Sequence, residues 1–394
     1  MPFREIKKGV YSVGAVDWDR RLFDELIPLP DGTSYNSYLI KTSDKTALID
    51  TVDPAKADIL LENLTSLGIR KIDYVIANHT EQDHSGTIPT ILKKFPESML
   101  VTNPKCKDFC ISHLHISEEK FYEVKDGDTL SLGDKTLEFI IAPWVHWPET
   151  MFTYSQEDRI LFPCDLFGSH LASSELYATD EMHVYPAAKR YYAEIMMPFR
   201  NNIKKHMAKL KNYDINVIAP SHGPVHKKPS FIMNAYEDWI SDKVKNEVLI
   251  PYVSMHGSVE RMVKYLVECL IQEGITVRPF NLTKTDIGDL AMALVDAATI
   301  VIASPTVLTG PHPAVIYATY LANLLRPKTR FASIIGSYGW GGKMPETIQG
   351  MIGNLKVELI QPVITRGNPR EEDFKALNQM AAAILAKHKS IKII

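Results

Sequence analysis

Four potential metal ligands occur within six residues of the sequence, at His79, Glu81, Asp83 and His84. They follow the apolar run KIDYVIA, which is typical of a buried β-strand. In a loop after this strand, residues 79, 81 and 83 alternate and can point into one cavity. Because imidazole and carboxylate groups buried together are unfavourable without a cation to neutralise them, the segment predicts a metal site.

Three further candidate ligands lie far apart in the sequence, and each comes just after a β-like apolar run. They are His146 in APWVHWPETMF, Asp165 in ILFPCDLFG and His222 in VIAPSHGPVH. Since the carboxyl ends of successive strands share one edge of a layered sheet, these residues can meet the first loop. One ion would then have two histidines, a glutamate and a bridging aspartate, and a second would have Asp83, the same Asp165 and His222. Mixed imidazole and carboxylate ligands favour iron, manganese or zinc over copper(I).

A separate group of cysteines and histidines offers an alternative metal site. Cys106 and Cys110 form CxxxC, and His113 and His115 form HxH shortly after it. We interpret this stretch instead as one helix followed by a turn. Its four side chains are therefore not expected to bind metal.

Two residues beside the predicted ligands could compete with them. Cys164 directly precedes Asp165, and we expect its thiol to pack in the core rather than bind metal. His226 lies four residues after His222 and is the weaker claimant for the same position.

A second set of chemically informative residues begins with the segment SMHGSV, which opens a predicted helix. Backbone N–H groups and small hydroxyls at a helix N-terminus bind phosphate, so such a loop needs no lysine or arginine. The segment matches neither GxGxxG nor a Walker loop. Two more loops, 304–310 and 336–342, follow later strands and would lie at the same sheet edge.

Three such loops around a switch point resemble flavodoxin, in which a flat isoalloxazine ring lies against backbone amides. The glycine-rich string SYGWGG suits close approach of backbone to a ring, with Tyr338 or Trp340 available for stacking. We therefore predict an FMN pocket. Its predicted contacts are Ser254, Met255, His256, Gly257, Ser258, Val259, Ser304, Pro305, Thr306, Gly310, Ser337, Tyr338, Gly339, Trp340 and Gly341.

These loops must be held by an α/β framework in two parts. Up to about residue 245 the chain has short β-rich runs at 10–15, 34–40 and 46–50, and a predicted helix at 85–95. From 247 onward, five strands alternate with helices, which predicts a doubly wound parallel sheet of order 2-1-3-4-5. We place the boundary in the polar segment between Asp242 and Glu247, with domains at 1–245 and 246–394.

Composition narrows the class of protein further. The chain has 394 residues, 45% hydrophobic and 23% charged, and a formal net charge of −3 without a basic block. Nucleic acid and anionic membranes are therefore not expected partners. The N-terminus lacks the apolar core of a signal peptide, and four scattered cysteines do not form a disulfide framework. These features favour a cytoplasmic location.

The motif HxExDH, followed by a distant His, a distant Asp and SHG, resembles the metallo-β-lactamase fold over residues 1–245. This resemblance implies a four-layer αββα sandwich. Hydrolases of that fold have HxHxDH, with a histidine where this chain has Glu81. A glutamate at this position resembles the motif of flavodiiron proteins, which carry a non-haem di-iron centre. The resemblance implies that His84 lies beside the metals without binding them. It assigns one iron to His79, Glu81, His146 and Asp165, and the other to Asp83, Asp165 and His222.

A lactamase-like domain joined to a flavodoxin-like domain resembles the flavodiiron family across nearly the whole chain. This implies that FMN relays electrons to the di-iron site, which reduces O2 to water or NO to N2O. No rubredoxin-like CxxC pairs follow the last helix, so the donor would be a separate molecule: rubredoxin, or a reduced F420-type cofactor. The resemblance also implies a head-to-tail homodimer, or a tetramer built from it.

Two other classes of function remain possible from the sequence. The first is a dizinc hydrolase with an attached flavodoxin-like domain, which Glu81 and the flavin loops disfavour. The second is an electron carrier whose first domain is only a scaffold, which six converging ligands disfavour. Metal and flavin content would distinguish the three classes.

Overall fold

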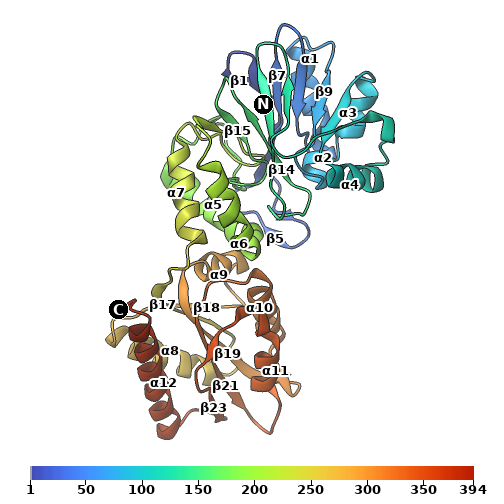
Figure 1. Ribbon diagram of the computed structural model, residues 1–394. Helices are drawn as coiled ribbons and strands as arrows, with labels where there is room; N and C mark the ends of the chain where they lie inside the picture. The colour runs from blue at the N-terminus through green and yellow to red at the C-terminus, as the bar shows by residue number, and fades with distance from the viewer. Residues whose placement is uncertain (1) are drawn as a thin grey trace. The chain divides into compact units, whose positions relative to one another are not determined.

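The computed structural model describes residues 2–394, which form two compact units (Figure 1). Unit 1 runs to Tyr192 and resumes at Phe199–Ile240, and unit 2 comprises Ala193–Pro198 with Ser241–Ile394. The division into functional domains at 1–245 and 246–394 stays a prediction. No helix within residues 2–394 is long and apolar enough to cross a membrane.

Unit 1 contains two large sheets. The first has the order β1-β2-β7-β8-β9-β10-β11, and the second has the order β12-β13-β14-β15-β16. The strands of the first are β1 (Arg4–Lys7), β2 (Val10–Ser12), β7 (Tyr38–Lys41), β8 (Thr46–Ile49), β9 (Tyr74–Ile76), β10 (Met99–Thr102) and β11 (Phe121–Glu123). Those of the second are β12 (Thr129–Ser131), β13 (Thr136–Ile141), β14 (Met151–Ser155), β15 (Ile160–Phe162) and β16 (Val217–Ile218). Two short pairs lie outside them, β3 (Ala15–Asp17) with β6 (Thr33–Tyr35) and β4 (Leu22–Phe23) with β5 (Ile27–Pro28).

Strand alternation builds two separate cores in unit 1. On β7, Leu39 faces the first sheet's helices, whereas Ile40 faces the second sheet. The core between the sheets includes Phe139 and Phe162 from the second sheet, both at most 1% exposed. This arrangement confirms the predicted sandwich, because each sheet packs one face on the other and one on helices.

The helices of unit 1 fall into two groups (Figure 1). Leu60, Leu64 and Ile91 pack on the outer face of the first sheet, while α6 lies against the second sheet, where His206 contacts Phe152. Helices of the first group are α1 (Ala57–Ser66), α2 (Gln82–Ser85), α3 (Ile88–Lys94) and α4 (Pro104–Leu114). Those of the second are α5 (Glu181–Tyr191), α6 (Arg200–Leu210) and α7 (Pro229–Ile240).

Unit 2 is a parallel sheet with the predicted topology. Its order is β18-β17-β19-β21-β22, with β23 also beside β21, so the predicted 2-1-3-4-5 order is confirmed. Only the short β20 is antiparallel, pairing with β19. The strands are β17 (Lys245–Tyr252), β18 (Thr276–Asn281), β19 (Ala297–Val307), β20 (Gly310–Pro311), β21 (Phe331–Tyr338), β22 (Glu358–Leu359) and β23 (Val363–Arg366).

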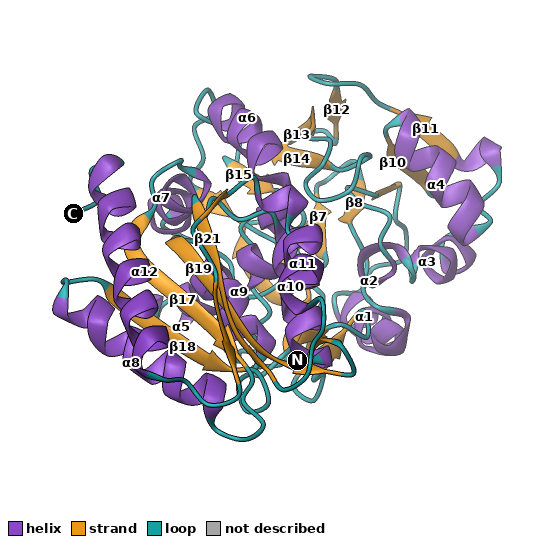
Figure 2. Ribbon diagram, turned by 90° about the horizontal axis from the view of Figure 1, so that it is seen from below, coloured by secondary structure: helices purple, strands orange, loops and turns teal. Residues whose placement is uncertain are grey.

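Helices cover both faces of this sheet (Figure 2). Helices α8 and α12 pack together on one face, and α9, α10 and α11 lie on the other. The apolar face predicted for α8, which includes Val259, Met262 and Leu266, is the buried one. The helices are α8 (Ser258–Gln272), α9 (Ile287–Leu294), α10 (Pro313–Leu325), α11 (Met344–Met351) and α12 (Glu371–Ser390).

Candidate metal centre and flavin pocket

The six predicted metal ligands meet at one edge of unit 1. They come from loops that follow β9, β13, β15 and β16, together with helix α2. Cys164 and Phe167 flank this edge with left-handed backbone, at φ 50° and 70°. Such strained positions gather at functional sites, where the surrounding structure holds them.

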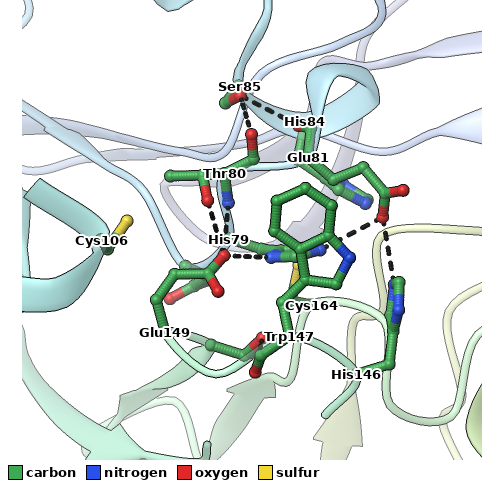
Figure 3. A network of polar contacts seen from close by, with 12 residues as sticks. His79, Thr80, Glu81, His84, Ser85, Cys106, His146, Trp147, Glu149 and Cys164 are labelled. Atoms are coloured by element: carbon green, nitrogen blue, oxygen red, sulfur yellow. Dashed lines mark hydrogen bonds and ion pairs between the residues drawn. The ribbon is translucent and has the colours of Figure 1, made fainter. Parts of the chain in front are cut away.

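One donor group consists of His79, Glu81, His146 and Asp165. The Nε2 atoms of His79 and His146 lie 3.2 and 3.0 Å from Glu81 Oε2 (Figure 3). Both nitrogen atoms are also 3.5 Å from Asp165 Oδ2. The lone pairs of four side chains therefore point toward one small space.

The second donor group consists of Asp83, His84 and His222. His222 Nε2 lies 3.1 Å from Asp83 Oδ2, and His84 Nε2 lies 3.3 Å from Asp83 Oδ1. His84, which the sequence assigned to an outer place, thus has its Nε2 within this group.

Asp165 faces both groups through different oxygen atoms. Its Oδ2 faces His79 and His146, whereas its Oδ1 lies 3.1 Å from His84 Nε2 and 3.4 Å from His222 Nε2. One carboxylate placed in this way can bridge two cations. The two groups therefore form a single dinuclear arrangement of donors.

Charge and burial indicate that the groups suit cations. Burial alone would lower the pKa of the histidines, but the carboxylates outweigh it and raise the pKa of His146 to about 9 and that of His222 to about 10. Despite burial, the histidines hold the pKa of Asp165 well below its usual value. Within residues 2–394, the buried carboxylate oxygens of Asp83 and Asp165 and both nitrogens of His84 make no hydrogen bond. Metal coordination would satisfy these atoms, so the donor set fits two metal ions.

A layer of hydrogen bonds orients the ligand histidines. Nδ1 of His79 lies 2.7 Å from Glu149 Oε1, and Nδ1 of His222 lies 2.6 Å from Ser34 O. Burial would raise the pKa of Glu149, but hydrogen bonds from His79 and Thr80 lower it below its usual value. When these Nδ1 atoms donate, the Nε2 lone pairs remain for the metals.

Behind the ligand loop, a buried carboxylate fixes the backbone. Asp50 accepts hydrogen bonds from the backbone N–H of Asn78 at 2.8 Å and from its side-chain amide at 3.0 Å. Thr153 donates to the same amide's oxygen at 2.8 Å. These contacts hold the residue before His79 between the two sheets.

Other side chains surround the donor groups without being counted among their members. The ring of His170 packs on those of His222 and Tyr191, at centroid distances of 4.9 and 4.8 Å. Burial and the carboxylates of Asp165 and Asp83 raise the pKa of Tyr191 well above its usual value. On the β4–β5 hairpin, burial and the carboxylate of Glu81 raise the pKa of Asp24 to about 6. Sequence reasoning missed these residues, because no ligand-like spacing marks them.

Unit 2 carries a pocket at the carboxyl edge of its sheet, with a volume of about 240 Å³. Ser258 and Ser337 join two of its loops through hydroxyl groups 2.9 Å apart. Ser258 opens α8 after Gly257, whose φ of 87° suits glycine. The lining residues are Met255, His256, Ser258, Pro305, Thr306, Ser337, Tyr338, Gly339, Gly367 and Asn368.

Known proteins match this chain over nearly its whole length, and so over both units. Residues 33–223 match the family model "ODP family beta lactamase". A nitric oxide reductase of Moorella thermoacetica is 36% identical, covering 97% of this chain and 98% of its own. A coenzyme F420H(2) oxidase of Methanothermobacter marburgensis is 32% identical, with coverage of 97% and 98%. The structure of rubredoxin oxygen:oxidoreductase from Desulfovibrio gigas matches with a TM-score of 0.95 at 29% identity, covering 98% of this chain and 99% of that one.

The chain belongs to the flavodiiron protein family. The solved flavodiiron protein of Giardia intestinalis also matches, with a TM-score of 0.87 and 28% identity over 98% of both chains. The family and the fold that the HxExDH motif and the flavin loops predicted are therefore confirmed. The chain is accordingly an oxidoreductase.

The side chains that were considered as alternative metal ligands do not belong to either donor group. Cys106 and Cys110 are fully buried on α4, and His115 ends that helix with left-handed backbone. Among residues 2–394, neither cysteine belongs to a cluster of potential metal ligands. His226 contacts Phe167 O at 3.2 Å through Nε2 and is likewise in no such cluster.

Cys164 lies closer to the donors than expected. Its thiol accepts a hydrogen bond from Ser221 Oγ at 3.3 Å, and it also forms a possible ligand cluster with His84 and Asp165. Burial raises the pKa of this thiol well above its usual value. Packing as a neutral thiol stays a prediction.

The predicted flavin contacts fall into two classes. Eight of them line the pocket, including Met255, Thr306 and Tyr338. Val259 is instead buried in the core, and Trp340 is 81% exposed. The remaining five, which the pocket lining does not include, are Ser254, Gly257, Ser304, Gly310 and Gly341. Gly367 and Asn368 also line the pocket, and they follow β23 directly, which is the signal that identified the other loops.

Proposed function

We propose that this protein reduces O2 to water, NO to N2O, or both, with electrons from an external donor. The observation that carries the proposal is the position of Asp165 between two buried donor groups, one of which contains Glu81. The names of the relatives support it, since they include a nitric oxide reductase, an F420H(2) oxidase and a rubredoxin-oxygen oxidoreductase.

In this proposal each donor group holds one iron. His79, Glu81 and His146 hold the first, Asp83 and His222 hold the second, and Asp165 bridges them. His84 is a further donor to the second iron, since its Nε2 lies among these atoms. Glu81 supplies a hard, anionic oxygen ligand, which suits iron that changes between ferrous and ferric states.

The pocket of unit 2 would hold FMN in the same proposal. The N-terminus of α8 and the hydroxyl of Ser258 suit the phosphate, and the backbone at Gly339 allows close approach of the ring. When bound, FMN accepts the donor's electrons and the two irons deliver them to the gas. Rubredoxin and a reduced F420-type cofactor are the proposed donors.

We also propose the head-to-tail homodimer, which would bring the FMN of one subunit to the metal centre of the other. Large apolar side chains exposed on α10 support a protein contact there, because such patches mark interfaces. They are Ile316, Tyr317, Tyr320 and Leu324. Light scattering should give a dimer for the wild type and a monomer for Tyr320→Glu; a monomeric wild type would refute the proposal.

The activity is tested on anaerobically purified protein. Metal and flavin analysis should give about two irons and one FMN per chain, and the photoreduced protein should be reoxidised rapidly by O2 or NO. The faster gas identifies the preferred substrate. Zinc without flavin, or a reduced flavin that neither gas reoxidises, would contradict the proposal and favour the hydrolase or the carrier.

A further inference from the structure

Glu149 is a buried carboxylate that the proposed ligand set does not use. It is 1% exposed, and its backbone is fixed because Asn103 Nδ2 donates to Glu149 O at 2.6 Å. A single oxygen, Oε1, lies 2.7 Å from His79 Nδ1, 3.1 Å from Thr80 N and 2.6 Å from Thr80 Oγ1 (Figure 3). Three donors therefore converge on one carboxylate oxygen.

This arrangement fixes the tautomer and orientation of His79. The charge of the buried carboxylate alone makes Oε1 an acceptor, so His79 donates from Nδ1 and keeps the Nε2 lone pair. That lone pair faces Glu81 and Asp165. The ring is also held by Trp147, which meets it edge-on at a centroid distance of 5.1 Å.

Among residues 2–394, neither histidine of the second donor group has a carboxylate hydrogen-bonded to its Nδ1 atom. His222 Nδ1 contacts the neutral carbonyl oxygen of Ser34, and within residues 2–394 the buried Nδ1 of His84 has no hydrogen bond partner. A carboxylate acceptor raises the basicity of a ligand histidine more than a carbonyl does. The two metal positions are therefore supported unequally.

We propose that Glu149 is a positioning residue that makes the metal position of His79, Glu81 and His146 the tighter and more electron-rich of the two. This inference rests on the proposed di-iron function. It assigns Glu149 an effect on one metal only, whereas a merely structural residue would affect both.

Metal binding by the full-length protein, measured with Fe(II) alone, tests this inference. Anaerobic titration of metal-stripped protein against a coloured chelator should show two affinity classes in the wild type. Glu149→Gln, which removes the charge but keeps the shape, should weaken the tighter class about 10–100-fold and leave the other unchanged. Thr80→Val is the matched control, because it removes a different hydrogen bond to Oε1, and both affinities should stay within about threefold of wild type.

A second readout is the reduction potential of the iron-loaded protein, followed by electron paramagnetic resonance. Loss of the charge in Glu149→Gln should raise the potential of one iron, because less electron density reaches it through His79. Glu149→Asp keeps the charge but withdraws it by one methylene, so it should give a smaller loss of affinity. It replaces Glu149→Gln in both measurements if that variant does not fold.

The outcomes separate this inference from the proposed function. Failure of the wild type to bind two Fe(II) ions would refute the function and the inference together. Two irons in the wild type, with both affinities unchanged or equally weakened by the Glu149 substitutions, would overturn the inference alone.

Discussion

His388 on α12 gives a pH dependence that can be worked out in advance. The ring is fully buried, with Nε2 2.7 Å from Thr299 Oγ1 and Nδ1 2.7 Å from Asn246 Oδ1. Both nitrogens are satisfied in the neutral form. Burial lowers the pKa of His388 from 6.5 to about 4.

The sign follows from proton binding. Between pH 6.5 and pH 4 the unfolded chain binds a proton at His388 that the folded chain does not. The stabilisation is therefore complete above pH 6.5 and falls as the pH decreases toward 4. The slope approaches about 1.4 kcal/mol per pH unit, and the loss reaches about 2.5 kcal/mol at about pH 4.5.

The test substitution is His388→Gln. Its amide can still contact Thr299 and Asn246 but does not titrate. Hydrogen exchange of α12 peptides, followed by mass spectrometry, should be compared in the two proteins at the same pH. The ratio of their exchange rates should change about 70-fold between about pH 7.5 and pH 4.5, because other titrating groups are shared. A ratio that stays constant would show that His388 does not contribute this pH dependence.

Substitutions at three further positions test the metal centre, the flavin pocket and the core of unit 1. Glu81→His replaces an anionic ligand with a neutral one and should exchange iron for zinc and slow gas reduction at least about tenfold; full iron content at an unchanged rate would contradict this. Ser258→Asp adds negative charge at the start of α8 and should lower FMN content more than about tenfold, whereas Ser258→Ala keeps most of it; equal flavin in both would count against the phosphate position. Phe139→Ala, between the sheets of unit 1, should destabilise by about 3–5 kcal/mol in urea unfolding, and a loss below about 1 kcal/mol would disprove its core role.

The fold was largely predictable because its periodicities are strong. The apolar stripe of α8 and the alternation of strands and helices after 247 identified the parallel sheet. The exact bounds of strands and helices were not predictable where single residues interrupt a pattern. The fifth sheet position is divided between β22 and β23, since Pro362 lacks the N–H that a continuous ladder needs. The helix expected from Ser85 starts at Ile88, after the separate short helix α2 at Gln82–Ser85.

The candidate metal ligands were predictable because they cluster in sequence or directly follow strands. Their supporting residues were not. Glu149 meets His79 across 70 residues, and Asn103 fixes its backbone from a third segment, so no spacing reveals the contact. His84 could be placed within the second donor group only from geometry, since the motif allows both an outer and an inner position.

The positions of the metals themselves decide whether the two donor groups hold a di-iron centre. Crystals grown from anaerobically purified protein should show two anomalous peaks at the iron absorption edge, about 3.5–4 Å apart, with Asp165 bridging them. A single peak, peaks that appear only at the zinc edge, or two peaks that do not share Asp165 would contradict the di-iron assignment.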